Sequence, residues 1–238
     1  MRVYYKNDSG SYIKMKGIVY IMQSMIRFSL FGNFEKFNTN NLDSYLKLID
    51  FFGKRGYKPA TANELQLQSN GQSRVLIMPI FLNESGAVVE ITSNRINFSK
   101  NSNNIFEIEM LREDFENEFL DLLCAFTSGM SIASNRVALN CDILKPDISV
   151  EMPTQSTYFD NANKTEMSVR NVARKEVEKE ESNVIIEKYV TTQGGFTKYS
   201  YDINSIGENQ VLRFNNSNIK KMYEAYISIA IEIEKGLK

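Results

Sequence analysis

The sequence contains no histidine. Histidine is the commonest general base near neutral pH and the commonest metal ligand in proteins. Its absence excludes Ser-His-Asp and Cys-His catalysis, zinc-hydrolase sites and histidine-dependent nucleases. Any chemistry carried out by this chain would therefore depend on carboxylates, lysine, tyrosine or bound Mg²⁺.

Cysteine is scarce, with two residues in a chain of 238. Two cysteines are too few for a disulfide framework, and their placement does not match a metal knuckle. Cys124 lies in an apolar helical pattern and Cys141 in an apolar alternation, so we interpret both as small buried hydrophobic residues. This usage predicts a reducing compartment.

Net charge and long apolar runs are also nearly absent. The chain has 28 Lys and Arg residues against 29 Asp and Glu residues, for a net charge of -1. No overall field attracts phosphate backbones or anionic lipids, so nucleic acid is not an expected partner. Gln23, Ser24 and Arg27 interrupt the apolar run at residues 17–31, well short of the ~20 apolar residues of a spanning helix. We expect a cytoplasmic protein with no membrane span.

Three segments have apolar residues at helical spacing. Residues 41–56 predict an amphipathic helix that ends at Gly53 or Gly56, residues 111–129 predict a long helix closed by Gly129, and residues 216–237 predict a terminal helix. Their apolar positions are Leu42, Tyr45, Leu46, Ile49 and Phe52 in the first, Leu111, Phe115, Phe119, Leu122 and Phe126 in the second, and Ile219, Met222, Tyr223, Tyr226, Ile229, Ala230 and Ile233 in the third. In addition, "TANE" at residues 61–64 has the form of a capping box and predicts a short helix or turn.

The other patterned segments alternate as strands do. Pro79 cannot donate a hydrogen bond to a neighbouring strand, which predicts that its strand lies at an edge or contains a bulge. Gly194 and Gly195 predict a hairpin turn. The expected strands are residues 25–31, 74–82, 87–92, 95–99, 136–144, 167–181, 183–192 and 196–203, of which 167–181 is expected to be long with a charged, solvated end.

These patterns predict an α+β fold of antiparallel meanders, each packed against one or two helices. The elements would form two subdomains or one large curved sheet. Pro146 opens a segment rich in Pro, Ser, Thr and Asn, which marks a boundary. We therefore divide the chain into a polar N-terminal tail that need not be ordered (1–16), an α+β subdomain (17–145), a linker or crossover (146–166), and a hairpin-plus-helix subdomain (167–238).

The succession "VVEITSNRINFS", "LREDFENEFLDLL" and "SNRVALNCDIL", within residues 74–145, resembles the middle of an uncharacterised, sporadically distributed bacterial protein family. The similarity lies in apolar positions and element order and contains no catalytic motif. The family brings no established activity or site residues. Its patchy distribution implies a link to mobile elements or to bacterial defence.

Two stretches nearly repeat each other: "ITSNRINFS" at residues 91–99 and "IASNRVALN" at residues 132–140. In each, Ser-Asn forms a turn and an arginine begins a strand, and the different contexts argue against a duplicated domain. The arginine side chains of Arg95 and Arg136 would ordinarily extend to solvent or to a carboxylate. If their strands are neighbours, however, the two arginines could form a site for an anion or a partner.

Further candidate binding residues lie in the last third of the chain. Arg170 and Arg174 are candidates for contact with an acidic partner, although interleaved glutamates favour a solvated face. Tyr199 and Tyr201 share one strand face, which suits either an interface or a core beneath the terminal helix.

Two hypotheses of different classes remain. The preferred one is a non-catalytic protein-interaction or scaffold protein that self-associates, an accessory of a bacterial defence or toxin-antitoxin system, with no cofactor, no metal and no catalytic residue. It rests on the missing catalytic motifs, the balanced charge and the strands that could offer edges to a partner. The alternative is a Mg²⁺-dependent nucleotide-binding or phosphoryl-transfer enzyme. There, Asp114 and Glu118 would share one helical face as ligands, although acids near a helix start also simply complement its dipole.

Overall fold

The computed structural model describes residues 23–67, 71–102, 107–146, 166–191, 196–207 and 211–236. Within these residues the chain forms nine strands, three α-helices and one short 3-10 helix. In chain order they are β1 (Ser24–Phe31), η1 (Glu35–Phe37), α1 (Leu42–Gly53), β2 (Lys58–Leu67), β3 (Ser73–Leu82), β4 (Ala87–Ile91), β5 (Arg95–Ser102), α2 (Ile108–Gly129), β6 (Arg136–Pro146), β7 (Glu166–Val177), β8 (Glu180–Thr191), β9 (Phe196–Ser205) and α3 (Asn216–Gly236).

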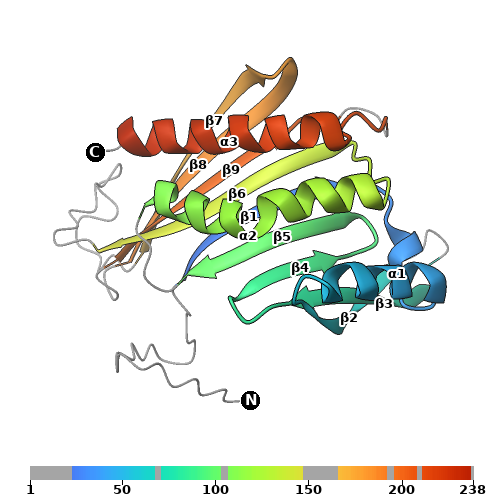
Figure 1. The fold of residues 1–238 in the computed structure, drawn as a ribbon. Coiled ribbons are helices and arrows are strands. Elements are labelled where there is room, and N and C mark those ends of the chain that lie inside the picture. The colour runs from blue at the N-terminus through green and yellow to red at the C-terminus, as the bar shows by residue number, and fades with distance from the viewer. Residues whose placement is uncertain are drawn as a thin grey trace.

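All nine strands form one antiparallel sheet in the order β2-β3-β4-β5-β1-β6-β9-β8-β7. Figure 1 shows α2 and α3 lying across the middle of the sheet, with α1 towards the β2–β3 end. The predicted α+β class is confirmed. Strands on the two sides of the predicted subdomain boundary pair directly, because β6 hydrogen-bonds to β9 along its length. The division into subdomains remains a prediction. The tail at 1–16 and residues 147–165 of the predicted linker lie outside the described residues.

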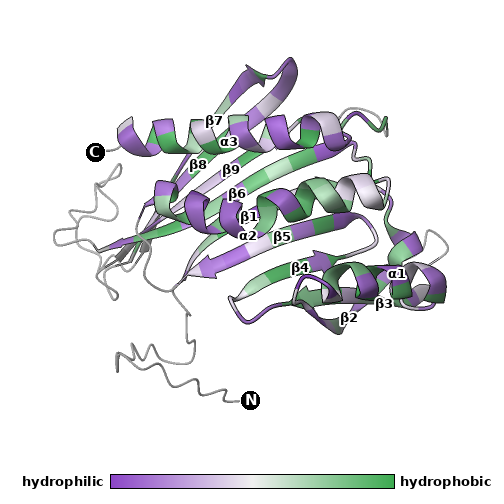
Figure 2. Ribbon diagram, viewed as in Figure 1, coloured by the Kyte–Doolittle hydropathy of each residue, from purple (hydrophilic) through white to green (hydrophobic). Residues whose placement is uncertain are grey.

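The core lies between the sheet and the helices. Alternate residues of β1, namely Ile26, Phe28 and Leu30, are fully buried, as period-two patterning requires. The Phe28 ring meets Tyr223 of α3 edge to face, with 5.5 Å between the ring centroids. In Figure 2 the apolar residues follow β4 and β6, whereas α2 and α3 carry both apolar and polar residues. Side chains of the opposite parity therefore lie on a sheet face that none of the three described helices covers.

The α1 helix confirms the predicted element but not all of its predicted apolar face. Leu48 and Phe52 are buried, and Phe52 stacks on Phe81 of β3 at 4.3 Å between ring centroids. Leu42 and Leu46 are 60% and 51% exposed. Leu48 and Phe52 are one helical turn apart on the side that faces the sheet, and this side excludes the other two leucines.

The short helix or turn predicted at residues 61–64 is wrong. These residues lie inside β2, which pairs with β3 along its whole length. The β3 strand that contains Pro79 is not an edge strand of the sheet and its register with β2 has no bulge, but at Pro79 itself β3 pairs on the β2 side alone among the described residues, which agrees with the reason for the prediction. Pairing of β3 with β4 covers only residues 80–82. Pro79 thus lies where no β4 residue needs its missing N–H.

The long strand predicted at residues 167–181 is confirmed as β7 as far as Val177, but its predicted charged end is wrong, because a turn separates β7 from β8, which begins at Glu180. Glu178 and Lys179, with φ angles of 50° and 68°, form the two-residue turn to β8. The turn predicted at Gly194 and Gly195 lies outside the described residues, although the strands that flank it, β8 and β9, pair as an antiparallel ladder. No helix among the described residues has the length and hydrophobicity needed to cross a membrane.

Candidate interaction surfaces

The first Ser-Asn-Arg stretch forms the turn between β4 and β5 and holds the chain that leaves β1. The backbone N–H of Gly32 donates to the carbonyl of Asn94 at 3.0 Å, and the N–H of Phe34 donates to the carbonyl of Ser93 at 2.7 Å. Ser93 also donates from its N–H and its hydroxyl to the two carboxylate oxygens of Glu64, at 2.8 and 2.6 Å. The turn therefore links the end of β1 to β2.

The second Ser-Asn-Arg stretch holds the end of β1 from the other side. The N–H of Phe31 donates to the hydroxyl of Ser134 at 3.0 Å, and this hydroxyl donates back to the Phe31 carbonyl at 2.7 Å. The N–H of Asn135 donates to the same carbonyl at 2.9 Å. Ser134 is completely buried. Both copies are thus structural anchors for residues 31–34, and each begins the strand that lies beside β1.

These anchors place Arg95 and Arg136 on the two sides of Phe31. Phe31 is paired with Arg95 of β5 and with Arg136 of β6, so the three residues form one row across the sheet. The strands β5 and β6 are not neighbours in the sheet, because β1 lies between them. The Cα atoms of the two arginines are nevertheless only about 10 Å apart, two strand spacings. The guanidinium carbon of Arg136 lies over the Phe31 ring, 4.0 Å from its centroid.

We call Arg95, Phe31 and Arg136 the arginine row. It lies on the sheet face that the described helices leave uncovered, because Phe28 and Leu30, of the opposite parity on β1, point to the core. Among the described residues neither arginine forms an ion pair, and the Nε atoms of both are buried without a hydrogen-bond partner. Of the two expected environments, solvent or a carboxylate, the described residues provide no carboxylate contact. The row thus holds two arginines beside one aromatic residue, with no described carboxylate within ion-pair distance of either.

Other arginines near this end of the sheet differ in their partners. Arg213, which donates to the carbonyls of Asn135 and Ile206, forms an ion pair with Glu180. Arg27 lies on β1 four residues before Phe31, on the same face, and donates to the thioether sulfur of Met25 at 3.4 Å. Arg27 thus extends the positive character of the row along β1, whereas the charge of Arg213 is neutralised.

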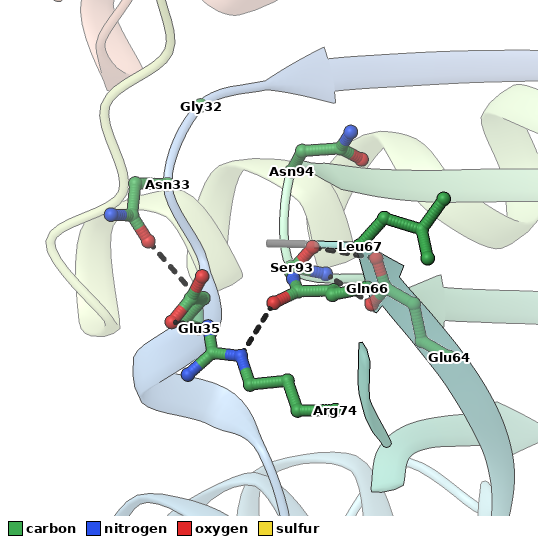
Figure 3. A pocket seen from close by; sticks show the side chains of 9 residues that line it. All are labelled: Gly32, Asn33, Glu35, Glu64, Gln66, Leu67, Arg74, Ser93 and Asn94. Atoms are coloured by element: carbon green, nitrogen blue, oxygen red, sulfur yellow. Dashed lines mark hydrogen bonds and ion pairs between the residues drawn. The ribbon is translucent and has the colours of Figure 1, made fainter. Parts of the chain in front are cut away.

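A cleft of about 450 Å³ opens next to the row (Figure 3). Its polar side chains satisfy one another: Glu64 is bound by Ser93, and Glu35 pairs with Arg74 at 2.7 Å. This cleft could not be predicted from the sequence, because one of its walls is formed by β2, where the sequence pattern predicts a helix or turn at residues 61–64. Its lining residues are Gly32, Asn33, Glu35, Glu64, Gln66, Leu67, Arg74, Ser93 and Asn94.

Arg170 and Arg174 lie on β7, at the edge of the sheet and far along it from the arginine row. Both side chains are exposed. Arg174 contacts Glu181 of β8 at 3.5 Å. Arg170 stands directly opposite Glu187, whose carboxylate accepts a hydrogen bond from Ser168. The structure therefore separates the four predicted arginines into two pairs.

Tyr199 and Tyr201 lie on the helix-covered face of β9. Tyr201 is only 2% exposed, and burial raises the pKa of its hydroxyl. Tyr199 is half-buried, with the ammonium groups of Lys145 and Lys188 each 5.7 Å from its ring centroid. The two alternatives for these residues were an interface and a core beneath the terminal helix, and Tyr201 occupies the core.

The carboxylate of Glu118 is held by three donors. The hydroxyl of Tyr57 donates to it at 2.6 Å, that of Ser85 at 2.8 Å, and the side-chain amide of Asn83 also binds it. Burial, followed by the effects of Glu118, raises the pKa of Tyr57. Asp114 is exposed one turn away. Glu118 thus fastens the turn between β3 and β4 onto α2, and the described residues contain no group of three potential metal ligands.

The two thiols occupy different environments. Cys141 is fully buried on β6, and burial raises its pKa. Cys124 is partly exposed on α2, and burial is also the main cause of its raised pKa. Both thiols are therefore protonated near neutral pH, which suits packing rather than nucleophilic chemistry.

Comparisons with known proteins found no matching family model, no similar curated protein and no similar solved structure.

Proposed function

We propose that this chain is a non-catalytic protein-interaction protein, and that the arginine row binds an acidic segment of a protein partner. The observation that supports this function is that Arg95 and Arg136 stand on either side of Phe31 in one row and have no carboxylate partner among the described residues. Arginine beside an aromatic ring is the composition that recurs where partners bind most strongly.

The dimensions of the row suit an extended peptide. Side chains on one face of an extended chain recur at every second residue, about 6.6 Å apart, so carboxylates two residues apart lie within reach of the long side chains of Arg95 and Arg136, whose Cα atoms are about 10 Å apart. Two carboxylates would satisfy both guanidinium groups through charge-assisted hydrogen bonds. Phe31 would cover the apolar part of the contact. The low net charge favours a local acidic segment over a long polyanion, which needs a broad basic surface.

We further propose that the protein acts in the cytoplasm as an accessory of a bacterial defence or toxin-antitoxin system. Support for this role comes from the resemblance of residues 74–145 to a sporadically distributed bacterial family and from the reduced state expected of its two cysteines. The role places the partner among the products of neighbouring genes, which are the first proteins to test.

The experiment compares capture of proteins from the native host by the wild-type chain and by the double variant Arg95→Ala, Arg136→Ala. The matched control is Arg55→Ala, because Arg55 also lies over a phenylalanine ring, at 3.8 Å from the Phe51 centroid, but in the turn that follows α1. We expect the double variant to lose a defined partner that Arg55→Ala retains. Equal capture by all three proteins would reject the arginine row as the binding site.

The same preparation separates this proposal from the enzyme alternative. Calorimetric titration with Mg²⁺ and a panel of nucleotides should give no saturable heat. Tight nucleotide binding that is lost in Asp114→Ala or Glu118→Gln would contradict a non-catalytic role and favour phosphoryl chemistry.

A further inference from the structure

The β7 strand is an open edge of the sheet. Among the described residues it pairs with β8 on one side and with no strand on the other, so every second N–H and C=O group points away from the described sheet. The side chains of residues 168–176 are all exposed, on both faces of the strand. Val169 and Val172 are 42% and 57% exposed. Figure 1 shows the β7–β8 hairpin extending past α3. A long exposed edge of this kind is a template for pairing with another strand.

The opposite edge of the sheet, β2, is less suited to pairing. Pro59 removes a backbone donor near the start of β2, and proline at an edge is a device that blocks strand addition. The described part of β7 contains no proline. If one edge of this sheet accepts a strand, β7 is therefore the better candidate.

The charges of β7 are incompletely paired within one chain. Glu176 stands directly opposite Glu181 of β8, a like-charge pair. Among the described residues neither Arg170 nor Glu176 forms an ion pair. Both side chains lie on the same sheet face, because their positions differ by an even number. An added strand that placed a cation beside Glu176 and an anion beside Arg170 would give each of these side chains a partner of opposite charge.

A second copy of β7 supplies these charges in one register. When two antiparallel copies are related by a twofold axis at Ala173, Arg170 of each chain faces Glu176 of the other. A shift of the axis to Val172 would instead place Arg170 opposite Arg174, and a shift to Arg174 would place that residue opposite its own copy. Only the Ala173 register among these pairs the charges favourably.

We propose that the protein forms a homodimer by antiparallel pairing of β7 with β7 of a second copy, centred on Ala173. The pairing joins the two sheets into one continuous sheet and closes the exposed edge. It also brings exposed Val169 beside Val177 of the other copy. This interface is separate from the arginine row, so it stands or falls independently of the proposed partner site.

Charge reversal tests the register. Sedimentation equilibrium should give the wild-type chain twice its mass of 27.4 kDa. Arg170→Glu and Glu176→Arg should each raise the dimer dissociation constant about tenfold or more, because each dimer contains two such opposed pairs. The double variant Arg170→Glu, Glu176→Arg should return to within about threefold of wild type. The controls Lys47→Glu and Glu113→Arg reverse exposed charges on helices and should leave the constant unchanged. A wild-type monomer, or a double variant as weak as the single ones, would overturn the proposal.

A cross-link provides a second test that does not depend on charge. Opposed residues of an antiparallel pair have Cα atoms about 4.5 to 5.5 Å apart, within disulfide range. In a Cys124→Ser background, Ala173→Cys should therefore form a disulfide-linked dimer on oxidation. Asn171→Cys, equally exposed, should not, because its two copies would lie about 13 Å apart. Efficient cross-linking at Asn171 rather than Ala173 would reject this register.

Discussion

Replacing Ser134 by alanine removes the hydroxyl that anchors the end of β1 beside the arginine row. The hydroxyl accepts from the N–H of Phe31 at 3.0 Å and donates to its carbonyl at 2.7 Å. The carbonyl keeps a second partner in the Asn135 N–H, whereas the hydroxyl is the acceptor for the Phe31 N–H. An unsatisfied buried donor costs about 1 to 3 kcal/mol. We therefore expect Ser134→Ala to lower the free energy of unfolding by about 2 kcal/mol.

Ser93, at the same position of the other Ser-Asn-Arg stretch, provides the matched comparison. Its hydroxyl donates to Glu64, but the Ser93 N–H also donates to that carboxylate and would remain in place. Glu64 is only partly buried, so water can replace the lost hydroxyl. Ser93→Ala should therefore cost less than about 1 kcal/mol. Urea unfolding of both variants and the wild type, monitored by far-UV circular dichroism, measures the difference between the two losses of unfolding free energy. Equal costs, or a larger cost for Ser93→Ala, would refute the reasoning.

Three further predictions concern the core. Leu48→Ala, at a fully buried position, should lower the free energy of unfolding by about 2 to 5 kcal/mol in chemical denaturation. Leu46→Ala, on the exposed side of α1, should lower it by less than about 0.5 kcal/mol. Glu234 pairs with Lys145 at 2.8 Å and accepts a hydrogen bond from the Ile108 N–H at 2.9 Å. Glu234→Ala should therefore lower the free energy of unfolding by about 3 kcal/mol or more, and Glu234→Gln, which retains an acceptor, should lower it by less. Equal losses for the two variants in chemical denaturation would contradict this. The free energy of unfolding should fall as the pH rises from about 10 to about 12, because ordinary tyrosines ionise near pH 10 in the unfolded chain while burial keeps the folded ones protonated. A flat profile would contradict the raised pKa values, which belong to Tyr57, Tyr201, Tyr223 and Tyr226, the last raised to about 12.

Local patterns predicted most of the elements but little of how the strands meet. The period-3.6 pattern of residues 111–129 and the alternation of β1, β6 and β7 need no distant partner to be recognised, and these elements are confirmed. The capping-box pattern at residues 61–64 failed because pairing with β3 outweighed a local helix signal. The apolar face of α1 was only partly predicted, since the direction from which the sheet approaches decides which leucines are buried.

The arginine row shows where sequence reasoning stops. The repeated Ser-Asn-Arg pattern identified both arginines, and each indeed begins a strand after a turn. The strand between them is β1, which lies at the start of the described chain. Its position depends on long-range strand order, and no local sequence pattern contains that information. Phe31 was therefore missed as a member of the row. The anchoring role of Ser93 and Ser134 likewise could not be predicted from the sequence, because both residues bind backbone groups of a distant segment.

The central claim is that Arg95 and Arg136 together bind carboxylates. The most direct test follows the side-chain Nε–H NMR signals of these two arginines during titration with a short glutamate-rich peptide, with a glutamine-rich peptide of equal length as the control. We predict that both signals shift together and saturably with the glutamate-rich peptide alone, and that the Arg55 signal does not move. Signals of Arg95 and Arg136 that stay fixed, or that respond equally to both peptides, would contradict the account.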